Sequence, residues 1–180
     1  YLDYNATTPV APEVVDAMLP WLRGEFGNAF SAHPFGRRAA MAVAEARQHV
    51  AELIGAQAQE IVFTGCATEA NNLALLGVAG ALGMTKRHLV VSAIEHPAVM
   101  APALHLREQG WALTVLPVDE FGRISPEALA GALRPDTALV SVMHANNEVG
   151  TLQPIREIAR ITRARGILLH TDAAQSAGKL

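Results

Sequence analysis

Polar side chains that could do chemistry follow directly after several short apolar segments of this 180-residue chain. Singly, each has an ordinary structural explanation. An Asn-Asn pair is typical of a turn, a His before Pro usually faces solvent or packs in a core, and Thr, Asp and Glu often cap helices. Together they combine imidazole, amide and carboxylate groups, which indicates a binding site. The residues are Thr68 and Glu69, Glu95 and His96, Asn146, Asn147 and Glu148, and Asp172 and Gln175.

The turn from Gly65 to Thr68 indicates what such a site would bind. Its sequence, Gly-Cys-Ala-Thr, places small residues in front of a predicted helix. The backbone N–H groups there are accessible and the helix dipole favours an anion, which is the geometry of a phosphate site. The turn matches neither a P-loop nor the glycine-spaced dinucleotide fingerprint, so alone it is a weak signal.

An imidazole, amides and a carboxylate near a phosphate suit a flat, phosphorylated heteroaromatic compound, and pyridoxal phosphate fits. Asp172 would pair with the protonated pyridine nitrogen and keep the ring an electron sink. His96 would stack on the ring, and Asn147 or Gln175 would bond its oxygen.

Two other kinds of site fit less well. The seven histidines are dispersed, and no spacing of His, Cys or Asp resembles a zinc or iron site, so no metal is expected. A Ser-His-Asp hydrolase is disfavoured because no Gly-x-Ser-x-Gly turn follows any predicted strand.

The elements that must position these residues alternate between strand and helix patterns. The strands are apolar on both faces, which predicts an α/β fold with a mainly parallel sheet and helices on both faces. Strands are predicted at 60–64, 88–92, 112–118, 138–144 and 167–170, and helices at 37–54, 67–82, 97–109, 125–134 and 154–165.

Ligands bind beyond the carboxyl ends of parallel strands, so the loops that follow the strands should meet at one edge. Four of the five predicted strands deliver polar loops there, while the fifth loop, beginning Asp119-Glu120, looks like an ordinary acidic turn. Residues 1–35 do not fit the alternation. We expect them to pack against a partner or a small domain, with residues 36–180 forming the cofactor-binding domain.

Composition excludes several classes of protein. The chain is 51% hydrophobic and 17% charged with a net charge of −3, and no basic run interleaves with aromatics, so direct nucleic-acid binding is not expected. A single cysteine cannot form an internal disulfide, which suits a reducing compartment. No long apolar run or signal-peptide pattern is present, so we expect a cytoplasmic protein without membrane contact.

The chain resembles the amino-terminal half of cysteine desulfurases, members of the class V aminotransferase group of fold-type I pyridoxal-phosphate enzymes. The resemblance runs in order along nearly the whole chain, and the Asn-Asn-Glu-Val-Gly and His-Thr-Asp-Ala-Ala-Gln-Ser stretches are its most specific parts. The matching segments are YLDYNATTP (1–9), FGN (26–28), 60–75, EHPAV (95–99), MHANNEVGTLQPI (143–155) and 163–180.

The resemblance implies a role for each site residue. Ala67 and Thr68 would hold the cofactor phosphate, and His96 would stack on the ring and assist proton transfer. Asn147 would bond the ring hydroxyl or the substrate carboxylate, while Asp172 would face the pyridine nitrogen. Gln175 would bond the ring oxygen.

The resemblance also implies an activity and partners. Such enzymes convert L-cysteine to L-alanine and leave the sulfur as a persulfide on an enzyme cysteine. The sulfur then passes to a scaffold or acceptor protein for iron–sulfur clusters, thiolated tRNA or modified DNA. Family members are homodimers. The phosphate turn departs from the usual pattern, since Gly65-Cys66 stands where Ser-Gly is more common.

Two covalent groups of this chemistry have no matching residue in the chain. Cys66 sits in the phosphate turn, a poor place for a thiol that must reach substrate sulfur, so we interpret it as a small residue that packs or forms part of the phosphate cradle. Lys86 precedes a predicted strand, and Lys179 does not match the Schiff-base lysine. We therefore expect the chain to be part of a longer or split enzyme and inactive alone. The alternatives are a selenocysteine lyase, another class V enzyme, or an inactive pyridoxal-phosphate-fold module that binds a partner.

Overall fold

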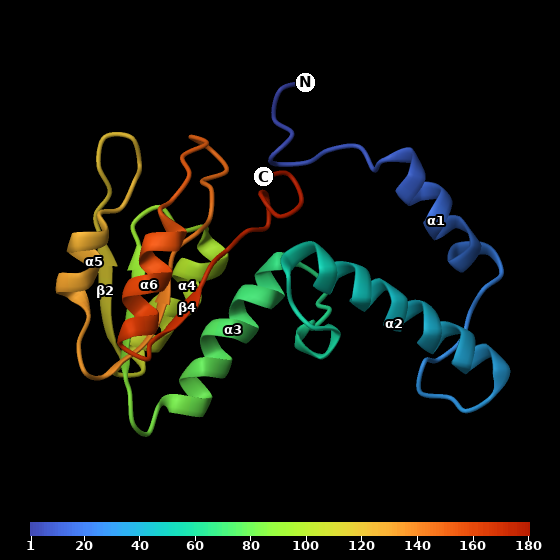
Figure 1. The fold of residues 1–180 in the computed structure, drawn as a ribbon, viewed down its shortest axis with the longest axis horizontal. Coiled ribbons are helices and arrows are strands. Elements are labelled where there is room, and N and C mark those ends of the chain that lie inside the picture. The colour runs from blue at the N-terminus through green and yellow to red at the C-terminus, as the bar shows by residue number, and fades with distance from the viewer. The chain divides into compact units, whose positions relative to one another are not determined.

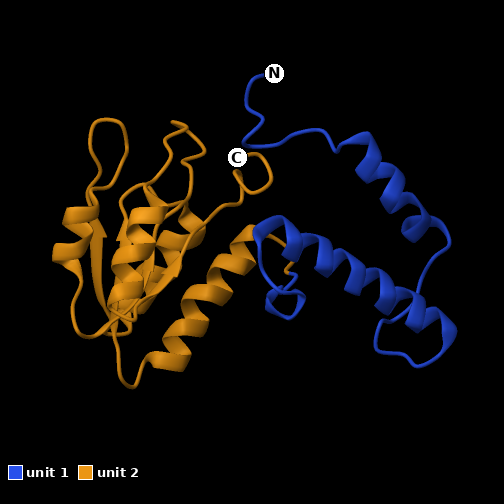
Figure 2. Ribbon diagram, viewed as in Figure 1, with its two compact units in different colours: residues 1–63 blue, residues 64–180 orange.

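A computed structural model describes all residues, 1–180, and divides them into two compact units, 1–63 and 64–180 (Figure 2). The first unit holds helices α1 (Pro12–Arg23) and α2 (Pro34–Ile54) and a 3₁₀ turn, η1 (Ala58–Glu60). Helix α1 buries none of its residues. The proposed division into 1–35 and 36–180 stays a prediction.

The second unit is a four-stranded parallel sheet with helices between the strands (Figure 1). Its strands lie in the order β2-β1-β3-β4, which confirms the predicted α/β class. The elements in chain order are α3 (Ala67–Leu82), β1 (His88–Ser92), α4 (Pro97–Glu108), β2 (Ala112–Leu116), α5 (Pro126–Ala132), β3 (Thr137–Ser141), α6 (Ile155–Ala164) and β4 (Leu168–His170).

Helices cover both faces of this sheet, as predicted. Neighbouring side chains of a strand point to opposite faces, so β1 contributes Leu89 and Val91 to one core and Val90 to the other. Helices α3 and α4 pack on the first face, and α5 and α6 pack on the second. Every residue of β1 and β3 is buried, which gives the loops that follow them a rigid base.

The predicted strand at 60–64 is wrong. Ile61 has extended backbone angles, φ −90° and ψ 126°, but the segment pairs with no other strand. Branched residues favour an extended backbone, whereas a strand also needs a neighbour that completes its hydrogen bonds, and local sequence does not supply that information.

A buried histidine links three strands at the amino edge of the sheet. His88 is fully buried in β1, and its two ring nitrogens lie 2.8 Å from the Thr137 hydroxyl and 2.9 Å from the Thr114 hydroxyl. Burial lowers the pKa of His88, the Arg134 charge lowers it further, and Asp136 opposes both. The folded state therefore favours the neutral ring.

We expect acid to remove the stability that neutral His88 contributes. The unfolded chain binds a proton near pH 6.5 while folded His88 stays neutral, so the free energy of unfolding falls as the pH drops below 6.5. The test is urea unfolding of the complete protein and its His88→Ala variant across this range. The stability difference between the two should be largest above pH 6.5 and shrink in acid. A difference independent of pH would contradict this interpretation.

Candidate cofactor site

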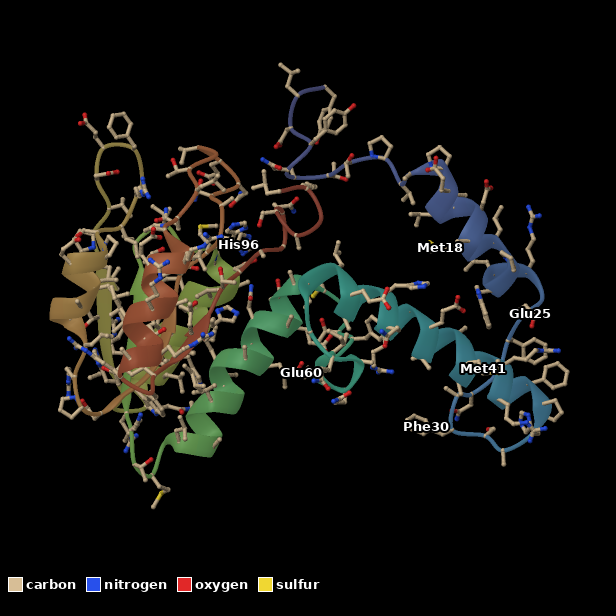
Figure 3. The ribbon with its side chains drawn as sticks, viewed as in Figure 1. Met18, Glu25, Phe30, Met41, Glu60 and His96 are labelled. Carbon is tan, nitrogen blue, oxygen red and sulfur yellow. The ribbon has the colours of Figure 1, made fainter.

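His96 begins helix α4 directly after strand β1 and lies where the loops that follow the strands gather (Figure 3). Its Nδ1 accepts a hydrogen bond of 3.0 Å from the backbone N–H of Ala98, and Pro97 occupies the first helical turn. Because Nδ1 acts as an acceptor, the neutral ring carries its proton on Nε2. The ring is exposed, so its face and the Nε2–H group are available to a ligand.

The amino terminus of α3 has the open geometry expected of an anion site. Cys66 is the N-cap residue, has an extended backbone, and makes no side-chain capping bond. The Glu69 carboxylate instead accepts from the N–H of Gly65 at 2.6 Å. The N–H groups of Ala67 and Thr68, in the first turn, therefore have no side-chain cap.

The Asp172 carboxylate is held from two sides after strand β4. One oxygen accepts from the side-chain amide of Asn71 in α3 at 2.8 Å, and the other accepts from the N–H of Ala174 at 2.9 Å. The backbone oxygen of Asp172 also accepts from the N–H of His144 at 2.9 Å. Asp172 thus caps a turn, which is the ordinary structural role of such a residue. Its side chain is also fixed to helix α3, which follows the phosphate turn.

The two adjacent asparagines after β3 have different structural positions. Asn146 is buried, and its side-chain oxygen accepts from the N–H groups of Glu148 and Val149 at 2.9 Å each. Its amide nitrogen donates to the Ile94 oxygen at 3.3 Å, which ties this loop to the one carrying His96. Asn146 therefore has the turn-forming role that is typical of an Asn-Asn pair, whereas Asn147 lines a pocket with His96.

Two pockets of the second unit meet at His96. The larger, of about 690 Å³, includes Asn147, and the smaller, of about 440 Å³, includes Thr68. Asp172 and Gln175 line neither of these two pockets. The structure thus brings His96 together with Thr68 and with Asn147, and it joins Asp172 to α3 through Asn71.

Gln175 and the two lysines lie apart from these pockets. The Gln175 side-chain oxygen accepts from Nζ of exposed Lys179 at 3.3 Å. Lys86 donates to the Gly166 oxygen at 3.4 Å, at the amino edge of the sheet, because Lys86 precedes β1 and Gly166 precedes β4.

The sequence does not single out Asn71, it includes Glu95 among the polar residues of the site without a specific role, and it predicts an ordinary turn for the loop beginning at Asp119. The structure places Asp119 to Gly122 in the wall of the larger pocket. Asn71 carries no signal in the sequence, since a polar residue in a helix is usually exposed. No group of three or more His, Cys, Asp or Glu side chains is arranged to hold a metal ion.

Glu95 is the most perturbed acid of this edge. Burial raises the pKa of Glu95 to about 7, the hydrogen bonds from Ser92 and Met143 lower it, and the nearby Asp172 charge raises it. Its carboxyl is therefore partly protonated near neutral pH.

Comparison with known proteins decides the family. The chain matches the aminotransferase class-V family over residues 1–180. It belongs to that family. Cysteine desulfurases IscS from Anaeromyxobacter sp. and Dictyoglomus turgidum are 54% and 48% identical over the whole chain, which spans 45% and 46% of their lengths.

Solved structures agree with this assignment. A NifS-like protein superposes on the entire chain with a TM-score of 0.96 and 40% identity, and the chain covers 50% of it. DndA from Streptomyces lividans has a TM-score of 0.89 and 48% identity, with the whole chain covering 51% of it. SspA, solved in complex with cysteine, has a TM-score of 0.94 and 42% identity, with 98% of this chain and 51% of SspA covered.

The resemblance to cysteine desulfurases is thus confirmed, and the chain spans about half the length of the relatives it matches. None of its helices is both long and apolar enough to cross a membrane.

Proposed function

We propose that this chain provides most of the pyridoxal-phosphate site of a cysteine desulfurase. The observation that carries the proposal is the joint geometry at one edge of the sheet. An uncapped helix terminus, an oriented histidine and a carboxylate fixed by Asn71 all lie in the second unit, within a chain whose whole length matches cysteine desulfurases.

The side chains present fit this cofactor. The N–H groups of Ala67 and Thr68 suit its phosphate because they point out of an uncapped helix terminus. The flat, exposed ring of His96 suits the face of an aromatic ring, and the Asp172 carboxylate suits a protonated ring nitrogen. Asn147 and Gln175 would bond ring oxygens. When bound, the cofactor supplies an electron sink for bonds at the substrate α-carbon.

The residues of this chain would then bind and move protons. Asn71 and the Ala174 N–H keep the Asp172 carboxylate in one orientation, so its negative charge stays where a ring nitrogen would need it. His96 lines both pockets, and its Nε2 would donate or accept a proton, because Nδ1 is occupied by the Ala98 N–H.

We infer that the substrate is L-cysteine, the product L-alanine, and the sulfur carrier an enzyme persulfide. The similarity to proteins named cysteine desulfurase and to a structure solved with cysteine supports this choice. We infer that neither lysine forms the Schiff base, because Lys86 lies at the amino edge of the sheet and Lys179 does not match the Schiff-base lysine of the family. The complete protein would supply that lysine and the persulfide cysteine from outside residues 1–180.

We also propose that the complete protein is a cytoplasmic homodimer that passes its sulfur to an acceptor or scaffold protein. The acceptor would serve iron–sulfur cluster assembly, tRNA thiolation or DNA modification.

The proposal is tested by measuring alanine and sulfide formed by the complete protein with pyridoxal phosphate. L-cysteine should give both products. Activity with L-selenocysteine alone would instead support a selenocysteine lyase. Cofactor-independent binding of a partner, with no product from either amino acid, would support an inactive module.

Replacing Cys66 with serine should leave most of the activity intact. Cys66 is exposed at the start of α3, and serine has nearly the same size, so turnover should stay within about 2-fold of wild type. The measurement is sulfide release together with mass analysis of the bound persulfide. A folded Cys66→Ser protein that forms no persulfide would show that Cys66 is the sulfur carrier after all.

A further inference from the structure

Glu95 is a buried acid to which the proposed chemistry assigns no role. It follows strand β1, precedes His96, and is 8% exposed. Its Oε1 accepts from the Ser92 hydroxyl at 2.5 Å and from the backbone N–H of Met143 at 2.8 Å. Its Oε2 is buried and has no hydrogen-bond partner.

This pattern of bonds suits a neutral carboxylic acid better than a charged carboxylate. One oxygen accepts from two donors, as a carbonyl oxygen does, and the other receives none. Neither ion pair of the structure includes Glu95, so no cation compensates a buried charge. An ionised carboxylate with one oxygen unsolvated and unpaired would be costly, whereas a proton on Oε2 removes the charge.

We propose that Glu95 is a positioning residue of the cofactor site, and that its protonated carboxyl ties the loop carrying His96 to the end of β3. The bond to Met143 crosses from the loop after β1 to the segment after β3, and the bond to Ser92 closes the turn in front of His96. Through these two bonds the position of His96 is set relative to the loop that carries Asn147. This role rests on the proposed function, because His96 is the group being positioned.

The charge of Asp172 favours the same protonation state of Glu95. Asp172 is close enough for its charge to raise the pKa of Glu95, after the larger effect of burial. His96 adjoins Glu95 in sequence, and His144 adjoins its partner Met143. The wall of the larger pocket, which also contains Glu95, adds three more carboxyl groups: Asp119, Glu120 and Glu148.

The direction of the pH dependence follows from these values. The folded protein holds the Glu95 proton up to about pH 7, while the unfolded chain releases it near 4.5. The stabilisation by protonated Glu95 is therefore complete below pH 4.5 and is lost as the pH rises through about 7. Two and a half pH units correspond to a change of about 300-fold in the folding equilibrium constant.

The first experiment compares urea unfolding of the complete protein with that of Glu95→Gln from about pH 4 to about pH 8, which spans both pKa values. Glutamine keeps the acceptor for Ser92 and Met143 but cannot titrate. The ratio of the two folding constants should shift in favour of the variant by up to about 300-fold as the pH rises from about 4.5 to about 7, and it should change little above pH 7. A ratio that does not change with pH would overturn the proposal.

A second measurement uses the wild-type protein, so it does not depend on whether a variant folds. The side-chain carboxyl carbons of glutamate are labelled, and their resonances are titrated in the wild-type protein. One resonance should have a midpoint near 7, and the proposal fails if every glutamate titrates near its ordinary value. Because neither experiment requires the cofactor, failure of the pyridoxal-phosphate proposal would leave both results unchanged.

The positioning role is tested by the affinity for the cofactor. Binding of pyridoxal phosphate is measured near pH 6 by its visible absorbance. Glu95→Gln should bind within about 3-fold of wild type, since its acceptor oxygen remains, and Glu95→Ala should bind at least about 10-fold more weakly. An equal loss of cofactor affinity in both variants would mean that the glutamine amide cannot replace the acid. Unchanged cofactor affinity in Glu95→Ala would mean that Glu95 does not position His96. Either result contradicts the role.

Discussion

Asp172→Ala should lower turnover of L-cysteine by roughly 10³-fold or more in the complete protein, because a fixed charge in a site is a large catalytic term. The carboxylate that would face the ring nitrogen is lost, and no other acid near Asn71 replaces it in the hydrogen bonds of this loop. The fold should remain, since Asp172 is only partly buried and joins neither core cluster. The measurement is alanine formation, with far-ultraviolet circular dichroism as the check on folding.

Two further variants sharpen this test. Asp172→Asn keeps the size of the side chain and an acceptor for the Ala174 N–H but removes the charge. It should therefore lose nearly as much activity as Asp172→Ala does. Asp136→Asn, in an exposed pair with Arg134 at the opposite edge of the sheet, should change turnover little. Near-normal sulfide release by Asp172→Ala would contradict the assignment of Asp172.

His96→Ala should reduce kcat by about 10²- to 10⁴-fold, the usual contribution of a positioned acid or base. His96→Phe separates the two roles proposed for this side chain. The phenyl ring can still lie against a flat cofactor, but it has no proton to give from the position of Nε2. We expect nearly normal cofactor affinity in the Phe variant, weakened affinity in the Ala variant, and low kcat in both.

His105→Ala is the matched control, because His105 lines the same smaller pocket as His96 and is exposed. Its ring nitrogen lies 2.9 Å from the Gln109 amide, on the outer part of α4, and no role in the chemistry is assigned to it. Turnover should stay close to wild type. A His96→Phe protein with normal kcat would show that His96 does not transfer protons.

The sequence predicts the regular elements of the second unit well, because their signals are local. Helix α3 begins after the Gly65-Cys66 turn as expected, and β1 spans the predicted residues 88–92. The apolar runs of β1 and β3 are buried on both faces, as their composition predicts for strands of a parallel sheet.

The sequence fails where a residue depends on a distant partner. The run at 60–64 has the composition of a strand but finds no neighbouring strand. Asn71 and Asp172 are 101 positions apart, and Glu95 and the Met143 N–H are 48 apart, so no local pattern predicts either contact. The candidate site is thus predictable in the residues that follow strands, and unpredictable in the side chains that hold those residues in place.

The most direct test of the central claim is to map the lysine that carries the cofactor. The complete protein is loaded with pyridoxal phosphate, reduced with borohydride, digested, and analysed by mass spectrometry. We predict one modified lysine, outside residues 1–180. Modification of Lys86 or Lys179, or no modified lysine at all, would contradict the account.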